Sequence, residues 1–170
     1  QEQVPARRFL YGSLRYTDLL LVALWAHKLR EGGRSTVLDV LGIHAVADVI
    51  LVLQPPPGYN REAHDPRSMG LQGLVREFVG ELNFVAQPEM GPGNANGMPF
   101  PFADQDLERL AAFALRKGTN LFNVLLQASE EGVLSSLNCV ISLHNGQHIS
   151  YNELSEGEKQ LLLVMGMMKF

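Results

Sequence analysis

Apolar residues recur at helical spacing along most of this chain and at strand spacing in a few shorter stretches. Runs bounded by capping residues and glycines predict helices over Thr17 to Leu29, Ser35 or Thr36 to Leu41, Leu71 to Leu82, Asp104 or Asp106 to Gly118, Thr119 to Gly132, and Ser155 to Phe170. Continuous or alternating apolar residues predict strands over Asp48 to Gln54, Cys139 to His144 and Gln147 to Tyr151. The pattern predicts a mostly helical α+β fold, and 170 residues favour one domain.

The last part of the chain, residues 139–170, predicts a short β-hairpin that leads directly into a helix. Asn145-Gly146 is the strongest short hairpin signal, and a two-residue turn there makes His144 face Gln147. Apolar residues of both strands then point to one face: Cys139, Ile141, Leu143, Ile149 and Tyr151. The returning strand delivers the chain to the start of the final helix.

That final helix begins with a strong capping signal. Ser155 and Glu158 have the spacing of a capping box, in which the serine hydroxyl accepts from the third helical N–H and the glutamate reaches back. The first turn of a helix carries unpaired N–H groups and the positive end of the dipole, which together favour an anion. Gly157 removes a side chain from this turn, so a ligand can approach the backbone closely.

The stretch from Leu154 to Gln160, Leu-Ser-Glu-Gly-Glu-Lys-Gln, resembles the signature motif of ABC-class ATPases. The form is that of the SMC/RecF-like branch and of related bacterial AAA-type ATPases linked to phage defence or restriction. In that family the serine hydroxyl and the glycine N–H contact the γ-phosphate of an ATP held by another subunit. The most familiar version of the motif has glycine where this chain has Glu156, a position that varies within the branch.

The resemblance implies a partial P-loop NTPase head of the ABC type, with residues 139–170 as its hairpin and signature helix. It implies that Ser155, Glu156, Gly157, Glu158 and Lys159 form the cofactor-binding segment. The implied cofactors are ATP and Mg²⁺, and the implied partner is a second copy of the head in an ATP-sandwich dimer. The resemblance leaves DNA or an effector nuclease open as further partners.

The other motifs of such an ATPase are absent from the printed sequence. No Gly-x-x-x-x-Gly-Lys-Ser/Thr loop occurs, and no apolar strand ends in Asp-Glu. We therefore expect the intact protein to hydrolyse ATP and residues 1–170 alone to be inactive. No catalytic residue is assigned. A start without Met and an end inside an apolar helix predict that residues 1–170 are a fragment of one head.

Composition adds little that is specific. An apolar share of 46%, a charged share of 19% and a net charge of −4 are ordinary for a globular protein, and they give no global attraction to nucleic acid. Cys139 is the only cysteine, which excludes an intrachain disulfide and favours a cytoplasmic location. The apolar run Leu19 to Ala26 is too short to span a membrane, so no membrane association is expected.

A second interpretation of the signature stretch stays open. Any soluble helix can begin with Ser-x-x-Glu, and such a cap stabilises by about 1 kcal/mol with no ligand present. In that case the chain is a non-enzymatic α+β interaction module, and Ser155-x-x-Glu158 is only a helix cap.

Several other candidate sites are weaker. Residues 1–16 mix arginines with aromatic residues and can bind nucleic acid, although an edge strand or loop with solvated arginines is more common. Gln54 is similar to the glutamine loop of ABC ATPases, but that loop belongs nearer a phosphate-binding motif. Residues 88–103 predict a flexible Gly/Pro/Asn-rich insertion and no phosphate-binding loop.

No metal site and no nucleophile are predicted. The histidines lack the cysteine or carboxylate neighbours that would complete a ligand set, and His27 and His44 fit packed or surface positions. Cys139 fits a small core residue, and Ser155 lacks a nucleophile elbow. The Met-rich helix Leu161–Phe170 is apolar nearly all round, which predicts burial between lobes.

Overall fold

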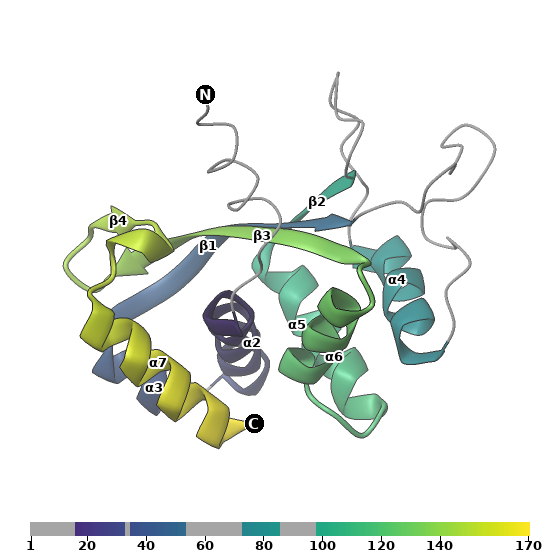
Figure 1. Cartoon of the computed structure of the whole chain (residues 1–170), viewed down its shortest axis with the longest axis horizontal. Coiled ribbons are helices and arrows are strands. Elements are labelled where there is room, and N and C mark those ends of the chain that lie inside the picture. The colour runs from purple at the N-terminus through teal and green to yellow at the C-terminus, as the bar shows by residue number, and fades with distance from the viewer. Residues whose placement is uncertain (1–15, 33–34, 54–72, 86–97) are drawn as a thin grey trace.

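The computed structural model describes residues 16–32, 35–53, 73–85 and 98–170, which form an antiparallel sheet with helices on one side (Figure 1). The strands are β1 (Ile43–Leu53), β2 (Met98–Phe102), β3 (Leu134–Leu143) and β4 (His148–Ile149), in the order β2-β1-β3-β4. The α-helices are α2 (Tyr16–Glu31), α3 (Thr36–Val40), α4 (Gly73–Val85), α5 (Asp104–Arg116), α6 (Leu121–Glu130) and α7 (Glu156–Lys169). The predicted fold class, α+β and mostly helical, is confirmed for this part of the chain.

Helix α2 lies at the centre of the packing. All ten residues from Thr17 to Ala26 are buried. A helix that is apolar all round must be covered on every side, and α2 packs against α5, α6 and α7 as well as β1 and β3 (Figure 1). The run Leu19 to Ala26, which is too short for a membrane span, therefore lies at the centre of the apolar core.

The caps of two helices differ from the predicted ones. The N-cap of α5 is Ala103, and the Asp106 carboxylate accepts a hydrogen bond from its N–H at 2.8 Å. Helix α6 is capped by Asn120, whose side chain accepts from Asn123 N at 2.9 Å, and not by Thr119. Before α6 the polar residues Thr119 and Asn120 are adjacent, and Asn120 is the one that caps the helix. In α5 neither aspartate is the N-cap, and Asp106 contributes from the third helical position.

Strand β1 begins five residues before the predicted start at Asp48 because its first half pairs with the end of β3. The register changes between Ala47 and Ile50, and Asp48 there adopts a left-handed backbone with φ of 52°. Such a bulge breaks the alternation of side chains, which is why a simple strand pattern misses the residues before it.

The predicted insertion over residues 88–103 is wrong for its last part. Met98 to Phe102 form β2, an edge strand that pairs with Val49 to Leu53 of β1. An edge strand tolerates Pro99 and Pro101 because it needs hydrogen bonds on one side only. Phe100 is fully buried and ties the strand to the core. Residues 86–97 lie outside the described residues, as do the arginine-rich residues 1–15 and Gln54.

The β3–β4 hairpin is confirmed, but its turn is longer than predicted. Ser142 pairs with His148, and Leu143 N donates to Gln147 O at 2.8 Å, so the loop is His144-Asn145-Gly146. Gly146 has a φ of 92°, which suits the left-handed last position of a three-residue loop. His144 therefore does not face Gln147. Its N–H donates instead to Gly42 O at 3.0 Å, which ties the loop to the start of β1.

Candidate functional site

The start of α7 has the predicted capping box. Ser155 Oγ accepts a hydrogen bond from Glu158 N at 3.1 Å, and Glu158 Oε1 accepts one from Ser155 N at 2.8 Å. Ser155 has the extended backbone that an N-cap requires, and its C=O accepts from Lys159 N at 2.9 Å. The cap therefore fixes both the side chain of Ser155 and the direction in which the first turn faces.

Gly157 stands in this first turn with nothing packed against it. A Cβ atom built on it would meet only Ser155 Oγ, at 4.0 Å, which is ordinary van der Waals contact. Its φ lies outside the left-handed region, so the backbone does not require glycine either. The fold gives no reason for glycine here, and the residue leaves open space beside the N–H groups of the first turn.

The five predicted cofactor-binding residues divide into two groups. Ser155, Glu156 and Gly157 are exposed. The side chains of Glu158 and Lys159 turn back onto the chain itself: the carboxylate of Glu158 completes the cap, and the ammonium of Lys159 lies 5.1 Å from the ring centre of Tyr151. Ser155 and Gly157 can therefore reach an external ligand directly, whereas Glu156 is exposed but ion-paired with Lys159 at 3.6 Å.

Three contacts hold α7 and the residues that flank it against α2. Between β4 and α7 a 3-10 helix, η1 (Tyr151–Glu153), buries Tyr151, whose hydroxyl accepts a hydrogen bond from Thr17 Oγ1 at the start of α2. In the last third of α7, Gly166 allows close approach, because an added Cβ would lie 3.1 Å from Leu20 Cδ1. At the far end the Phe170 ring lies 5.7 Å from that of His27. These contacts fix the position of α7 relative to α2, which it crosses in Figure 1.

A shallow hollow of about 340 Å³ lies between the start of α2, η1 and the first half of α7. Its lining comes from Tyr16, Thr17, Tyr151, Glu156, Lys159, Gln160 and Leu163. The contact between Thr17 and Tyr151 is one that the sequence did not predict. The two residues are 134 positions apart, and no local pattern connects them.

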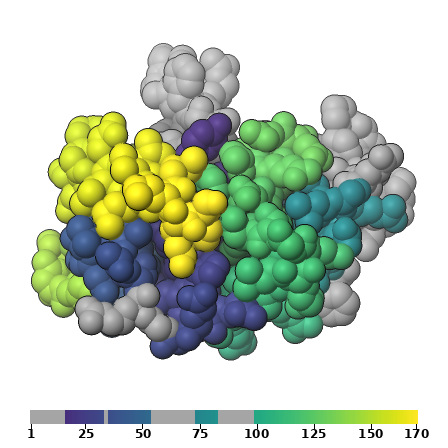
Figure 2. All heavy atoms as spheres, turned by 90° about the horizontal axis from the view of Figure 1, so that it is seen from below, coloured from purple at the N-terminus to yellow at the C-terminus, as the bar shows by residue number. Residues whose placement is uncertain are grey.

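The predicted burial of the C-terminal half of α7 is wrong for the described residues. Leu162 and Gly166 face the core, but Val164 is 54% exposed and Met168 is 82% exposed. Figure 2 shows α7, in yellow, at the surface of the helical side. Val164 and Met168 form an exposed apolar face together with Leu161 and Met167. The helical spacing of Gly157, Leu161, Val164 and Met168 places these four residues on the same side of the helix.

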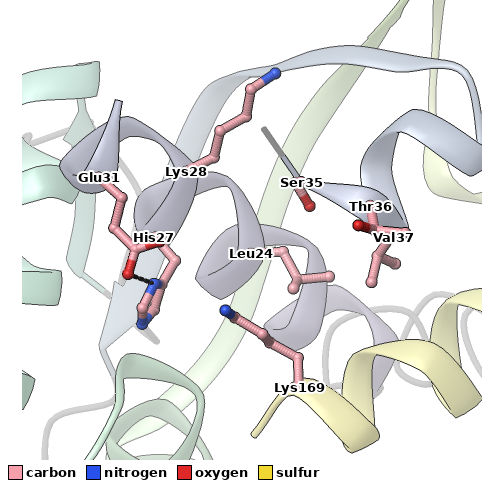
Figure 3. A pocket seen from close by; sticks show the side chains of 8 residues that line it. All are labelled: Leu24, His27, Lys28, Glu31, Ser35, Thr36, Val37 and Lys169. Carbon is pink, nitrogen blue, oxygen red and sulfur yellow. Dashed lines mark ion pairs between the residues drawn. The ribbon is translucent and has the colours of Figure 1, made fainter. Parts of the chain in front are cut away.

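A second hollow, of about 140 Å³, lies beside the C-terminal ends of α2 and α7 (Figure 3). His27 Nδ1 lies 3.3 Å from Glu31 Oε2 without the alignment of a hydrogen bond, and the Lys169 side chain extends toward the same space. His27 packs under Phe170, as a packed residue was expected to. The contact with the Phe170 ring gives His27 a structural role in this region.

The described residues contain no group of three or more His, Cys, Asp or Glu side chains arranged to hold a metal ion. The exposed rings of His44 and His144 meet edge to face at 5.5 Å, which links the start of β1 to the hairpin loop. Among the described helices, none combines the length and apolar character needed to cross a bilayer.

Comparison of the chain with protein-family models, with curated proteins and with solved structures finds no match. The candidate site therefore rests on its own geometry: a capped helix start, an exposed serine and an unobstructed glycine.

Proposed function

We propose that this chain is the signature-bearing part of an ABC-type ATPase head of the SMC/RecF-like branch. Its task is to contact the γ-phosphate of an Mg²⁺-ATP held by a second copy of the head. The observation that carries the proposal is the open first turn of α7, in which Ser155 and Gly157 are exposed beside a rigid cap.

The chemistry of this turn suits a phosphate. Ser155 Oγ already accepts from Glu158 N, which leaves its own O–H to donate to a phosphate oxygen. The N–H of Gly157 belongs to the first turn of the helix, where backbone donors have no partner within the helix. Hydrogen bonds from such donors to an anion are charge-assisted and stronger than neutral ones. They are lost when the phosphate leaves, so nucleotide hydrolysis can release one head from the other.

The proposal is tested by two substitutions at Ser155 in the full-length natural protein that contains this sequence. Ser155→Arg places a long cationic side chain over the first turn and should abolish ATP-dependent dimerisation while each monomer still binds ATP. Ser155→Asp keeps a good N-cap, because aspartate caps helices as well as serine does, but it turns a negative charge toward the phosphate. Both variants should remain monomeric in sedimentation runs with ATP, and Ser155→Asp should keep the melting temperature of the wild type.

Ser155→Asn is the matched control for the cap, since an asparagine side chain can also accept a hydrogen bond from the backbone N–H of Glu158 but adds no charge. Its dimerisation should fall between those of the wild type and Ser155→Asp. If Ser155→Arg and Ser155→Asp dimerise with ATP as the wild type does, the phosphate contact at Ser155 is refuted.

One observation favours a second candidate, the non-enzymatic interaction module. The apolar face of α7 exposes four large side chains, those of Leu161, Val164, Met167 and Met168, and a contiguous exposed apolar patch commonly marks a contact with another protein. Under this candidate the capping box serves stability only, and substitutions at Gly157 leave function unchanged while Val164→Ser and Met168→Ser weaken association without any nucleotide.

A further inference from the structure

The first turn of α7 carries a charge that opposes the proposed phosphate contact. Glu156 occupies the first helical position, next to Gly157, and its side chain is 89% exposed. A carboxylate at a helix N-terminus is attracted by the same positive dipole end that would attract a phosphate. A free Glu156 side chain would therefore compete with the phosphate and repel it.

Lys159 is placed to remove this conflict. Its Nζ lies 3.6 Å from Glu156 Oε1, one turn further along the helix. The ammonium also lies over the Tyr151 ring, at 5.1 Å from the centre, and its side chain is only 21% exposed. Tyr151 is buried and accepts a hydrogen bond from Thr17, so the surface on which the ammonium lies is itself fixed.

The other carboxylate of this turn is already engaged. Glu158 accepts from the Ser155 N–H and is drawn back toward the N-cap. Glu156 is therefore the carboxylate of this turn whose position depends on a cation.

We infer that Lys159 is a positioning residue that holds and neutralises the Glu156 carboxylate, which leaves the turn around Gly157 open to the γ-phosphate of the partner's ATP. This inference rests on the proposed function. It assigns Lys159 no direct phosphate contact.

The test is a double-mutant cycle in the full-length natural protein, with the dissociation constant of the ATP-bound dimer as the readout. Lys159→Met keeps an unbranched side chain over the Tyr151 ring, where its sulfur still packs well, but leaves Glu156 unpaired. It should weaken the dimer by roughly two- to fivefold, the effect of one charge near a helix end. Glu156→Gln should tighten the dimer by a similar factor, and the double variant should return close to the wild type.

Two controls separate this electrostatic effect from a loss of structure. Lys169→Met removes a positive charge from the other end of the same helix, about 15 Å away, and should change the dimer little because salt screens charges beyond about 8 Å. The effect of Lys159→Met should also shrink as salt is raised, whereas a packing defect would persist. Melting temperatures of all variants should agree within about 2 °C, since an ion pair whose carboxylate is 89% exposed contributes little stability.

If the double variant is as weak as Lys159→Met alone, Lys159 acts without Glu156 and the inference is overturned. If Lys159→Met dimerises as the wild type does, the inference is equally overturned. Failure of the proposed function looks different: Ser155→Asp would then dimerise normally, and the inference about Lys159 would fall with it.

Discussion

Replacing Gly157 with alanine separates the two interpretations of the α7 start because the fold does not need a glycine there. The added methyl would meet no atom nearer than Ser155 Oγ at 4.0 Å, and the backbone is in a region that alanine adopts freely. Alanine is the better helix former by up to about 1 kcal/mol. Gly157→Ala should therefore raise the free energy of unfolding by about 0.5–1 kcal/mol, which for a chain of this size is about 1–4 °C in melting temperature.

The same methyl should damage the proposed contact. It occupies the space through which a phosphate oxygen would approach the N–H of residue 157, and one charge-assisted hydrogen bond is worth about 1.5–3 kcal/mol. The ATP-dependent dimer of the full-length natural protein should therefore weaken on the order of ten- to a hundredfold. Calorimetry measures the stability, and sedimentation with and without ATP measures the dimer.

Gly80→Ala is the matched control. Gly80 lies within α4, and a Cβ atom built there meets nothing within 4 Å, so this variant should gain stability as well and keep normal dimerisation. A Gly157→Ala protein that is more stable and dimerises normally with ATP would show that the capping box is only a cap. A Gly157→Ala protein that loses stability would refute our description of the first turn.

Three further predictions test the packing that positions this turn. Gly166→Leu should lower the free energy of unfolding by about 1–3 kcal/mol, because a side chain there overlaps Leu20, and chemical denaturation measures the loss. Thr17→Val and Tyr151→Phe should each cost about 1 kcal/mol, and the double variant should cost little more than either alone; additive costs in the same assay would contradict a shared hydrogen bond. Phe100→Ala should cost about 3–5 kcal/mol, whereas a loss below about 1 kcal/mol would mean that β2 is not part of the core.

What the sequence predicts well here is local. The capping box at Ser155 depends on four successive residues and on general helix geometry, and its hydrogen bonds are as expected. The central position of α2 follows from its unbroken apolar run from Leu19 to Ala26. Gly42 follows α3 and Gly132 follows α6, and both have a positive φ, which is common for the residue after a helix C-cap.

What the sequence does not predict depends on contacts between distant residues. Strand β2 forms because Phe100 is buried in the core and the strand backbone pairs with β1. Its two prolines, by contrast, are typical of a loop. The Thr17–Tyr151 hydrogen bond joins opposite ends of the chain. The position of Lys159 over the Tyr151 ring is likewise visible only once η1 is folded against α2, so the distinction between ligand-facing and inward-facing residues of the signature stretch needed the structure.

The most direct test of the central claim is photo-crosslinking of the full-length natural protein with an ATP analogue that carries its photoreactive group on the γ-phosphate. Our account predicts that the labelled peptide contains the first turn of α7, with the adduct at Ser155 or within two residues of Gly157. It also predicts that labelling there requires the dimer and disappears in Ser155→Arg. Labelling that never reaches this turn, or that is as strong in the monomer as in the dimer, would contradict the account.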